Sequence, residues 1–138
     1  MKAELSWCKN VVSVHGSPEH IEELVEFVRG QKEFDLGHRL NGETVEGALF
    51  TFHSIIPIKS KSWSSALGLE NWNSRTDAIN VEMYYEDNYV VYEFLTPWCA
   101  PYPVAEKLIK TFPDIFCSWH YHEPQNMLSG YIKSKSKI

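Results

Sequence analysis

Hydrophobic residues recur at helical spacing in two segments of the chain, residues 18–29 and residues 102–112. Ser17 and Pro18 precede the first segment as an N-cap and a first helical residue, and Gly30 follows it. Pro101 and Pro103 open the second segment, and Pro113 ends it. Both patterns predict amphipathic helices. The apolar side of the first helix, which we expect to be buried, consists of Ile21, Leu24, Val25 and Val28.

Other segments have the composition or the alternation of β-strands. Residues 115–122 alternate apolar and polar side chains with a period of two, which is typical of a half-buried strand. Glu86-Asp87-Asn88 separates two β-rich runs and predicts a hairpin turn between them. The stretch 57–76 predicts a long connection that aromatic side chains pin to the core. The expected strands are residues 10–15, 49–56, 78–85, 89–95, 115–122 and 128–133.

The order of these elements predicts the fold class. Strand, helix, strand, hairpin, helix and strand follow one another as in two split β-α-β units, whose helices lie on one face of an antiparallel sheet. We therefore expect an α+β fold, a ferredoxin-like sandwich with two helices on one face of its sheet. A chain of 138 residues suits one domain, which we place at residues 1–132, followed by a flexible basic tail at residues 133–138.

Composition narrows the location and the partners. Lys and Arg number 13 against 18 Asp and Glu, and the formal charge of -5 argues against a nucleic acid and favours a protein with a basic surface as partner. No apolar segment has the length of a signal peptide or of a membrane span, so we expect a cytoplasmic protein. Three cysteines at irregular spacing indicate neither a disulfide framework nor a zinc site, and we expect no cofactor.

Several short segments follow one another in an order that resembles a known family. They are Trp7-Cys8-Lys9-Asn10, Ile55-Ile56-Pro57, Asn71-Trp72, Thr96-Pro97-Trp98 and Lys110-Thr111-Phe112-Pro113-Asp114. Over most of its length the chain resembles the YubB ferredoxin-like domain family, which occurs on phages and conjugative plasmids. It departs from the family's pattern at residues 73–76 and at Ala100. The resemblance implies the ferredoxin-like fold and a mobile-element setting in a bacterial host cell, and it implies no reaction.

Two groups of side chains have the residue types of a reaction centre. His120 and His122 lie two residues apart in a predicted strand, so both rings leave the same face, but no third metal ligand shares that face. Cys99 precedes a predicted helix, where the helix N-terminus would lower the pKa of its thiol, with His120 as a base. No cysteine-protease signature, phosphate loop or Ser-His-Asp motif accompanies them. We therefore expect solvent-facing histidines and a cysteine that serves packing, with Cys8 in the same role.

The residues that we expect to contact a partner are acidic or aromatic. Glu19, Glu22, Glu23 and Glu26 repeat at helical spacing out of phase with the apolar stripe, so they should form one acidic outer face. This face is either an ordinary solvated surface or a docking surface for a basic partner. Tryptophans at turns either pin loops to the core or act as binding hot spots. The two that we expect to be exposed are Trp63 and Trp72.

These observations favour a binding protein over an enzyme. The first hypothesis is a small accessory protein of a phage or plasmid, a non-enzymatic protein-binding module, with inhibition of a host defence factor or a nucleic-acid-binding factor as one form of its action. The alternative is a nucleic-acid-binding ferredoxin-like domain whose sheet stacks bases. A second alternative is a small enzyme that uses Cys99 or the pair His120 and His122. Ferredoxin-like folds host all three classes, so the fold does not choose among them.

Overall fold

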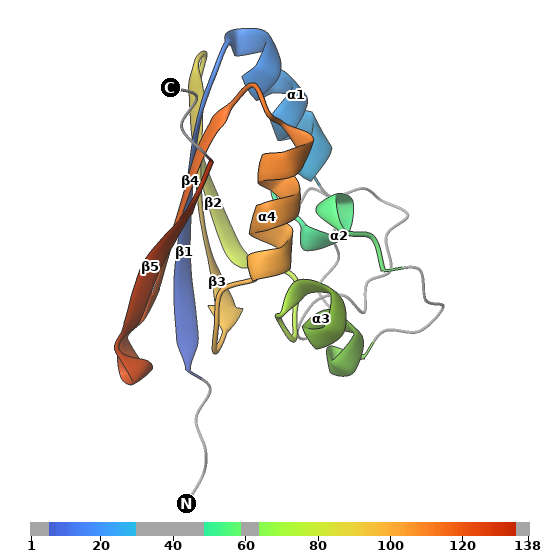
Figure 1. The fold of residues 1–138 in the computed structure, drawn as a ribbon, viewed down its shortest axis with the longest axis vertical. Helices are drawn as coiled ribbons and strands as arrows, with labels where there is room; N and C mark the ends of the chain where they lie inside the picture. Colours follow the sequence, from blue (N-terminus) through green and yellow to red (C-terminus); the bar gives the residue numbers. More distant parts are fainter. Residues whose placement is uncertain (1–5, 30–48, 59–63, 135–138) are drawn as a thin grey trace, which may run out of the picture.

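The computed structural model describes residues 6–29, 49–58 and 64–134, which form one sheet covered on one side by helices (Figure 1). The sheet has five strands in the order β2-β3-β1-β4-β5, and every neighbouring pair is antiparallel. β1 therefore lies at the centre, between β3 and β4. The strands are β1 (Trp7–His15), β2 (Ile79–Glu86), β3 (Tyr89–Pro97), β4 (Phe116–Glu123) and β5 (Leu128–Lys133).

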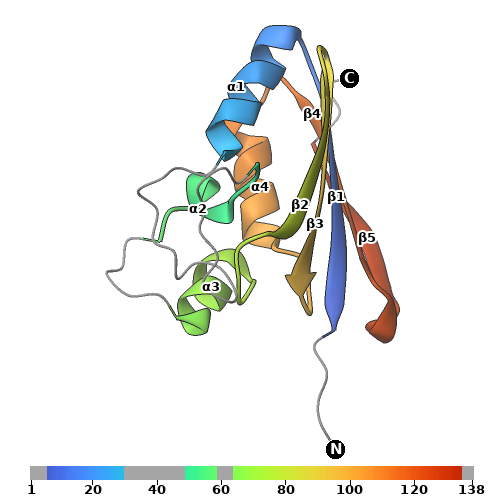
Figure 2. The ribbon, with the colours of Figure 1, turned by 180° about the vertical axis from the view of Figure 1, so that it is seen from behind.

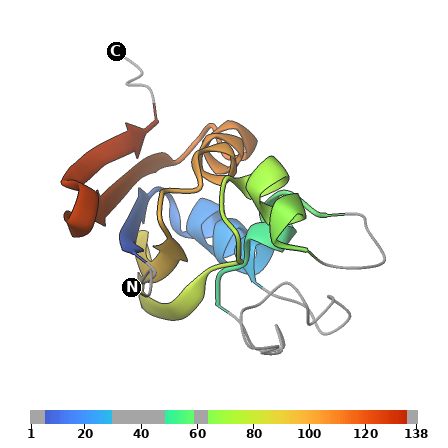
Figure 3. The ribbon, with the colours of Figure 1, turned by 90° about the horizontal axis from the view of Figure 1, so that it is seen from below.

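Helices α1 to α4 lie on the same side of this sheet, and no helix of the described residues covers the opposite side (Figure 2, Figure 3). The chain order β1-α1-β2-β3-α4-β4 and the spatial order β2-β3-β1-β4 are those of a ferredoxin-like sandwich. The predicted fold class is confirmed, and β5 extends the sheet by one edge strand. The helices are α1 (Pro18–Val28), α2 (Phe52–Ile55), α3 (Ser65–Trp72), α4 (Tyr102–Thr111) and the 3-10 helix η3 (Pro124–Asn126).

The two longest helices begin where the sequence predicts. The Ser17 hydroxyl accepts a hydrogen bond from the His20 N–H at 3.3 Å, and Pro18 is the first residue of α1. α4 begins after Pro101 without a side-chain cap. Each helix buries an apolar stripe, and the predicted stripe of α1 is confirmed, with Val25 half-buried at its edge. The buried residues are Ile21, Leu24 and Val28 in α1 and Val104, Ala105 and Leu108 in α4.

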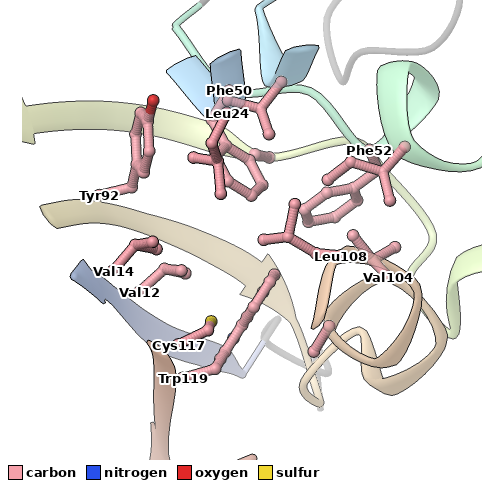
Figure 4. Close-up of a cluster of buried hydrophobic side chains, with 14 of the residues drawn as sticks. Val12, Val14, Leu24, Phe50, Phe52, Tyr92, Val104, Leu108, Cys117 and Trp119 are labelled. Atoms are coloured by element: carbon pink, nitrogen blue, oxygen red, sulfur yellow. The ribbon is translucent and has the colours of Figure 1, made fainter. Parts of the chain in front are cut away.

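Phe50 lies in the middle of the core between the helices and the sheet (Figure 4). The centre of its ring lies 4.9 Å from that of Tyr92, 5.0 Å from that of Phe94 and 5.9 Å from that of Trp119. Aromatic pairs at these separations contribute roughly 0.5 to 1.5 kcal/mol beyond the area that they bury. The segment before α2 is therefore fixed to β3 and β4 by side-chain packing rather than by strand pairing.

The predicted strand at residues 49–56 is wrong, because the chain forms helix α2 there. The Thr51 hydroxyl caps this helix by accepting the Ser54 N–H at 3.3 Å. The carboxylate of Asp77, which precedes β2, accepts the N–H of Phe52 at 2.6 Å. A carboxylate that is distant in sequence thus satisfies a donor at the helix N-terminus, and the local apolar run does not reveal it.

The connection at residues 57–76 contains helix α3, and its predicted aromatic anchor is confirmed in Trp72. The indole N–H of Trp72 donates to the Ile56 carbonyl at 2.9 Å, and its ring lies edge-on to Phe52 at 5.7 Å. Asn73 ends α3 with a left-handed φ of 58°. The described part of this connection therefore belongs to the helical layer.

The last strand agrees with the one predicted at residues 128–133, so Lys133, which the predicted tail also included, belongs to the sheet. Lys133 is the last residue of β5, and the N–H of Ser134 donates to the Cys117 carbonyl at 2.9 Å. The hairpin of β2 and β3 and the strands β4 and β5 lie where the sequence predicts them. Residues 31–47, whose polar and glycine-rich composition predicts a loop or a short irregular helix, lie outside the described residues, as do residues 135–138 of the predicted tail.

Candidate functional site

The outer face of α1 is acidic, as the sequence predicts. Glu19, Glu22, Glu23 and Glu26, which we call the acidic face, are all exposed. Within the described ranges only Glu26 has an ion-pair partner, Arg29, at 3.5 Å, and this pair is exposed too. Pairs of this kind contribute roughly 0 to 1 kcal/mol. The fold therefore makes little use of these carboxylates, and their role in binding a partner stays a prediction.

A small hollow lies beside the acidic face, where α1 approaches the turn after α4. The Nε2 atom of His20 lies 3.9 Å from a carboxylate oxygen of Asp114, and both side chains are substantially exposed. The hollow measures about 140 Å³ and is lined by His20, Glu23 and residues 111–115. Sites for small molecules usually measure roughly 300 to 1,000 Å³. The hollow is therefore too small to serve as a substrate pocket.

Trp72 is buried, contrary to the prediction that it is exposed. Its side chain is 0% exposed, and its N–H is already bonded to the Ile56 carbonyl. A tryptophan in this position stabilises the core through apolar area and one satisfied hydrogen bond. Trp63, the other tryptophan that we expected to be exposed, lies outside the described residues.

Aromatic residues that the sequence analysis did not single out are exposed on the open face of the sheet, the side without helices. Tyr84 on β2, Phe116 on β4 and Tyr131 on β5 are 56%, 47% and 59% exposed. The Tyr84 ring lies 5.8 Å from that of Tyr89, which stacks on His15 at 5.5 Å. The alternation of residues along each strand could have predicted their exposure, because they lie between residues that are buried.

The centre of the open face is aliphatic and charged rather than aromatic. Val11 and Ser13 of β1 lie there opposite Glu93 and Val91 of β3, and the Lys9 ammonium lies 3.4 Å from the Glu93 carboxylate. A sheet that binds single-stranded nucleic acid presents aromatic rings on which the bases stack. The open face offers such rings only toward its ends and edges.

Cys99 has the environment of a structural thiol. Its sulfur donates to the Asn73 carbonyl at 3.3 Å and receives the Asn73 amide at 3.5 Å. Burial raises the pKa of the Cys99 thiol above its ordinary value, which lowers the fraction of nucleophilic thiolate. His120, the base considered for it, points to the open face of the sheet, where its ring lies 4.8 Å from Tyr131. The structure does not bring Cys99 and His120 together.

Cys8, Cys117 and the pair His120 and His122 do not form a reaction centre with other described residues. Burial raises the pKa of both Cys8 and Cys117, to about 12 for Cys117. His120 and His122 lie on the same face of β4, as predicted, and His122 is exposed. Among the residues that the structure describes, no three His, Cys, Asp or Glu side chains cluster where they could hold a metal ion.

A buried polar network that the sequence analysis missed joins several segments at one end of the sheet. The Asn10 amide donates to the Thr96 hydroxyl at 3.0 Å, and its oxygen accepts the Trp119 indole N–H at 2.9 Å. The Thr96 hydroxyl donates to the Cys99 carbonyl at 2.8 Å. Asn10 and Thr96 belong to the segments on which the family resemblance rests. Their buried polar atoms are hydrogen-bonded to one another, which indicates a role in specifying the fold.

Glu123 is a second buried polar residue, at the end of β4. Its carboxylate accepts the Ser6 hydroxyl and the backbone N–H groups of Gln125 at 3.2 Å and Asn126 at 2.6 Å. These donors, the Ser6 hydroxyl foremost, hold the pKa of Glu123 below its ordinary value although burial opposes them. The carboxylate caps η3. Glu123 therefore has a structural role on the helix side of the sheet and is not a third ligand for the histidine pair.

Comparisons with known proteins agree with this topology. Residues 71–138, just under half of the chain, match the model of a family described as a ferredoxin-like domain in Api92-like protein. A crystal structure of a protein Api92 from Yersinia pseudotuberculosis matches with a TM-score of 0.69 at 13% identity, covering 96% of this chain and 95% of that chain. No curated protein matches the sequence. The fold is ferredoxin-like.

The similarity to Api92 extends over nearly all of both chains, but at 13% identity it establishes the fold alone. It supports the ferredoxin-like part of the sequence resemblance, whereas the YubB family and the mobile-element setting stay predictions. Among the described helices, none has the length and apolar character needed to cross a membrane. A ferredoxin-like fold does not determine a function, which depends on the surfaces of the individual chain.

Proposed function

We propose that this protein is a non-enzymatic protein-binding module that docks on a basic surface of its partner through the acidic face of α1. One observation carries the proposal: the four glutamates of this face are exposed, and only one of them is paired within the described chain. Unpaired charges of one sign on a rigid helix attract a surface of opposite charge and orient it during encounter.

A mobile-element setting gives this proposal a concrete form. A phage or plasmid accessory protein acts on proteins of its host, and host factors that bind nucleic acids expose basic surfaces for phosphate groups. The acidic face would occupy such a surface in place of phosphates. Inhibition of a host defence factor or of a nucleic-acid-binding factor is therefore the form of action that we propose.

The arrangement of the other chemical groups supports a binding role over catalysis. A nucleophile needs an adjacent base and a third group that orients the base. Cys99 instead bonds to Asn73, and the histidines of β4 face the open side of the sheet without a third ligand in the described residues. We therefore rank an enzyme using Cys99, His120 or His122 last.

Nucleic-acid binding is a second candidate, favoured by one specific observation. Tyr84, Phe116 and Tyr131 are exposed on the open face, and the Lys133 ammonium lies 4.8 Å from the Tyr131 ring. Carboxylates on the same face and the net charge of -5 oppose it. A fluorescent single-stranded DNA or RNA titrated at low salt distinguishes the candidates, because tight binding would favour the open face over the acidic face.

The proposal is tested by capturing a partner from a lysate of a bacterial host at two salt concentrations. Wild-type protein is compared with the double variant Glu22→Lys/Glu26→Lys, whose side chains point to water. We expect the wild type to retain one specific protein at low salt, less of it at high salt, and the variant to retain much less.

A control with the same change of charge on other elements separates a local effect from a change of net charge. Glu70→Lys/Glu82→Lys alters exposed residues of α3 and β2 by the same number and sign of charges, and we expect it to capture the same partner nearly as well as the wild type. A partner that binds the wild type and the α1 variant equally well would contradict the proposed role of the acidic face.

A further inference from the structure

A groove runs along the outer side of α4 and is bounded on one side by β5. It measures about 720 Å³, within the range of roughly 300 to 1,000 Å³ that is usual for binding sites. Ile109 of α4 and Ile132 of β5 contribute apolar surface to it, as do Ile56 and Pro103. The groove can therefore accept an apolar side chain between a helix and an edge strand.

The charges around this groove are opposite in sign to those of the acidic face. Lys107 and Lys110 of α4 line it, against the single carboxylate of Glu106, and all three are exposed. Lys133 of β5 also belongs to the lining, but its ammonium lies over the Tyr131 ring on the open face. In a protein with a net charge of -5, such a concentration of lysines favours an acidic ligand. The lysines of the groove thus favour an acidic ligand, whereas the acidic face of α1 favours a basic one.

β5 has an unpaired outer edge. It is the last strand of the sheet, and no other strand in the described ranges pairs with its outer side. The Ser134 N–H points toward β4, where it bonds to Cys117, and N–H groups alternate along an antiparallel strand. The N–H groups of Lys133 and Tyr131 therefore point outward. Such an edge is a template for another strand.

The opposite edge of the sheet is better protected against strand addition than the β5 edge, whose single charged residue is Lys133 at its end. β2 has a register shift between Ile79 and Glu82, and Asn80 within it has a φ of 55°. Bulges and charged side chains on an edge strand are devices that prevent pairing. β5 pairs with β4 in continuous register along all six of its residues and has no proline.

We propose that an extended acidic segment of another protein adds to the sheet as a sixth strand beside β5 and places an apolar side chain in the groove between α4 and β5. Backbone hydrogen bonds to the outer edge of β5 provide the pairing, and Lys107 and Lys110 select the acidic sequence. This site is independent of the acidic face, because it lies on another helix and takes a ligand of opposite charge.

The probe is a fluorescent peptide with a central Val-Thr-Val sequence flanked by two glutamates at each end, and its control has lysines in place of the glutamates. Anisotropy should show binding of the acidic peptide that weakens with salt, and little binding of the control. In spectra of isotope-labelled protein, the amide signals of residues 128–134 should shift. Lys107→Glu/Lys110→Glu should weaken binding about fivefold, as expected for exposed charge pairs.

Two substitutions at one position test the strand pairing itself. Tyr131→Pro removes an outward N–H, and proline is tolerated on strand edges whose N–H faces solvent. Tyr131→Thr removes the same ring but keeps the N–H. We expect Tyr131→Pro to weaken peptide binding about tenfold and Tyr131→Thr to change it less than about twofold, with circular dichroism confirming that both are folded.

Several outcomes would contradict the proposal. Equal binding of the acidic and the basic peptide, or no binding of either, would overturn the selection by charge. Shifts confined to α1 or to β2 would place the site elsewhere. Equal losses in Tyr131→Pro and Tyr131→Thr, or a bound peptide in helical conformation, would rule out strand addition. If Tyr131→Pro proves unfolded, the amide shifts and the lysine variant decide the outcome.

Discussion

Helices α1 and α4 are alike on their inward faces and opposite on their outward faces. Inward, each lays one stripe of aliphatic residues on the same sheet. Outward, α1 presents four carboxylates, whereas α4 presents Lys107 and Lys110 beside Glu106. The requirements of the core therefore explain what the helices share and leave their difference unexplained.

In a fold that serves many functions, the outward faces of the helices can vary with function, whereas the inward faces cannot. A buried stripe is fixed by packing, because the helix must cover the sheet. An exposed charge contributes little to stability, so its sign is free to follow a binding partner. On this view α1 and α4 serve different partners, a basic surface and an acidic segment.

The largest effects should come from the inward faces, where the helices are alike. Leu24→Ala in α1 and Leu108→Ala in α4 each delete a fully buried side chain. Each substitution should lower the free energy of unfolding by about 2 to 5 kcal/mol, measured by urea denaturation. An unchanged midpoint for either variant would show that its helix does not pack on the sheet as described.

A smaller effect should separate the two helices at their N-termini. Ser17 caps α1 through the N–H of His20, whereas α4 has no side-chain cap. Ser17→Ala should therefore cost about 1 kcal/mol, and Ser17→Thr, which keeps the hydroxyl, should cost less. Equal losses for both substitutions would indicate that the hydroxyl does not act as a cap.

The regular parts of the fold were predictable because their signals are local. Ile21, Leu24 and Val28 repeat within three turns of helix, and Cys117 and Trp119 alternate within one strand, so each pattern reveals its buried side. These periodicities led to the ferredoxin-like fold, although the predicted chain order included a strand at residues 49–56 that the structure replaces with α2.

The errors arose where partners distant in sequence decide the structure. Residues 52–55 form a helix with Asp77 bonded at its N-terminus, and their apolar run resembles a strand. Trp72 is buried because its ring packs against Phe52 and its indole N–H donates to the Ile56 carbonyl. Its neighbours in sequence are polar, so they do not predict this burial. The groove beside α4 combines α4 with β5, so no single segment of sequence predicts it.

The smallest effects on stability should come from the outward faces, where the helices differ. Glu22→Lys/Glu26→Lys and Lys107→Glu/Lys110→Glu should each change the free energy of unfolding by less than about 1 kcal/mol, because the side chains are exposed. Thermal denaturation of both variants beside the wild type measures this. A loss comparable to that of Leu24→Ala would mean that the charges serve the fold, and the functional comparison of the two helices would fail.

The role of the acidic face is tested by the association rates of the captured partner with immobilised wild type, Glu22→Lys/Glu26→Lys and Cys99→Ser, each at low and at high salt. If the acidic face is the docking surface, the charge reversal should slow association about tenfold or more at low salt. High salt should reduce the difference in rate between this variant and the wild type. Cys99→Ser should associate at the rate of the wild type. If a folded Cys99→Ser protein loses all activity toward the partner while the charge reversal changes nothing, the protein is not the binding module that we propose.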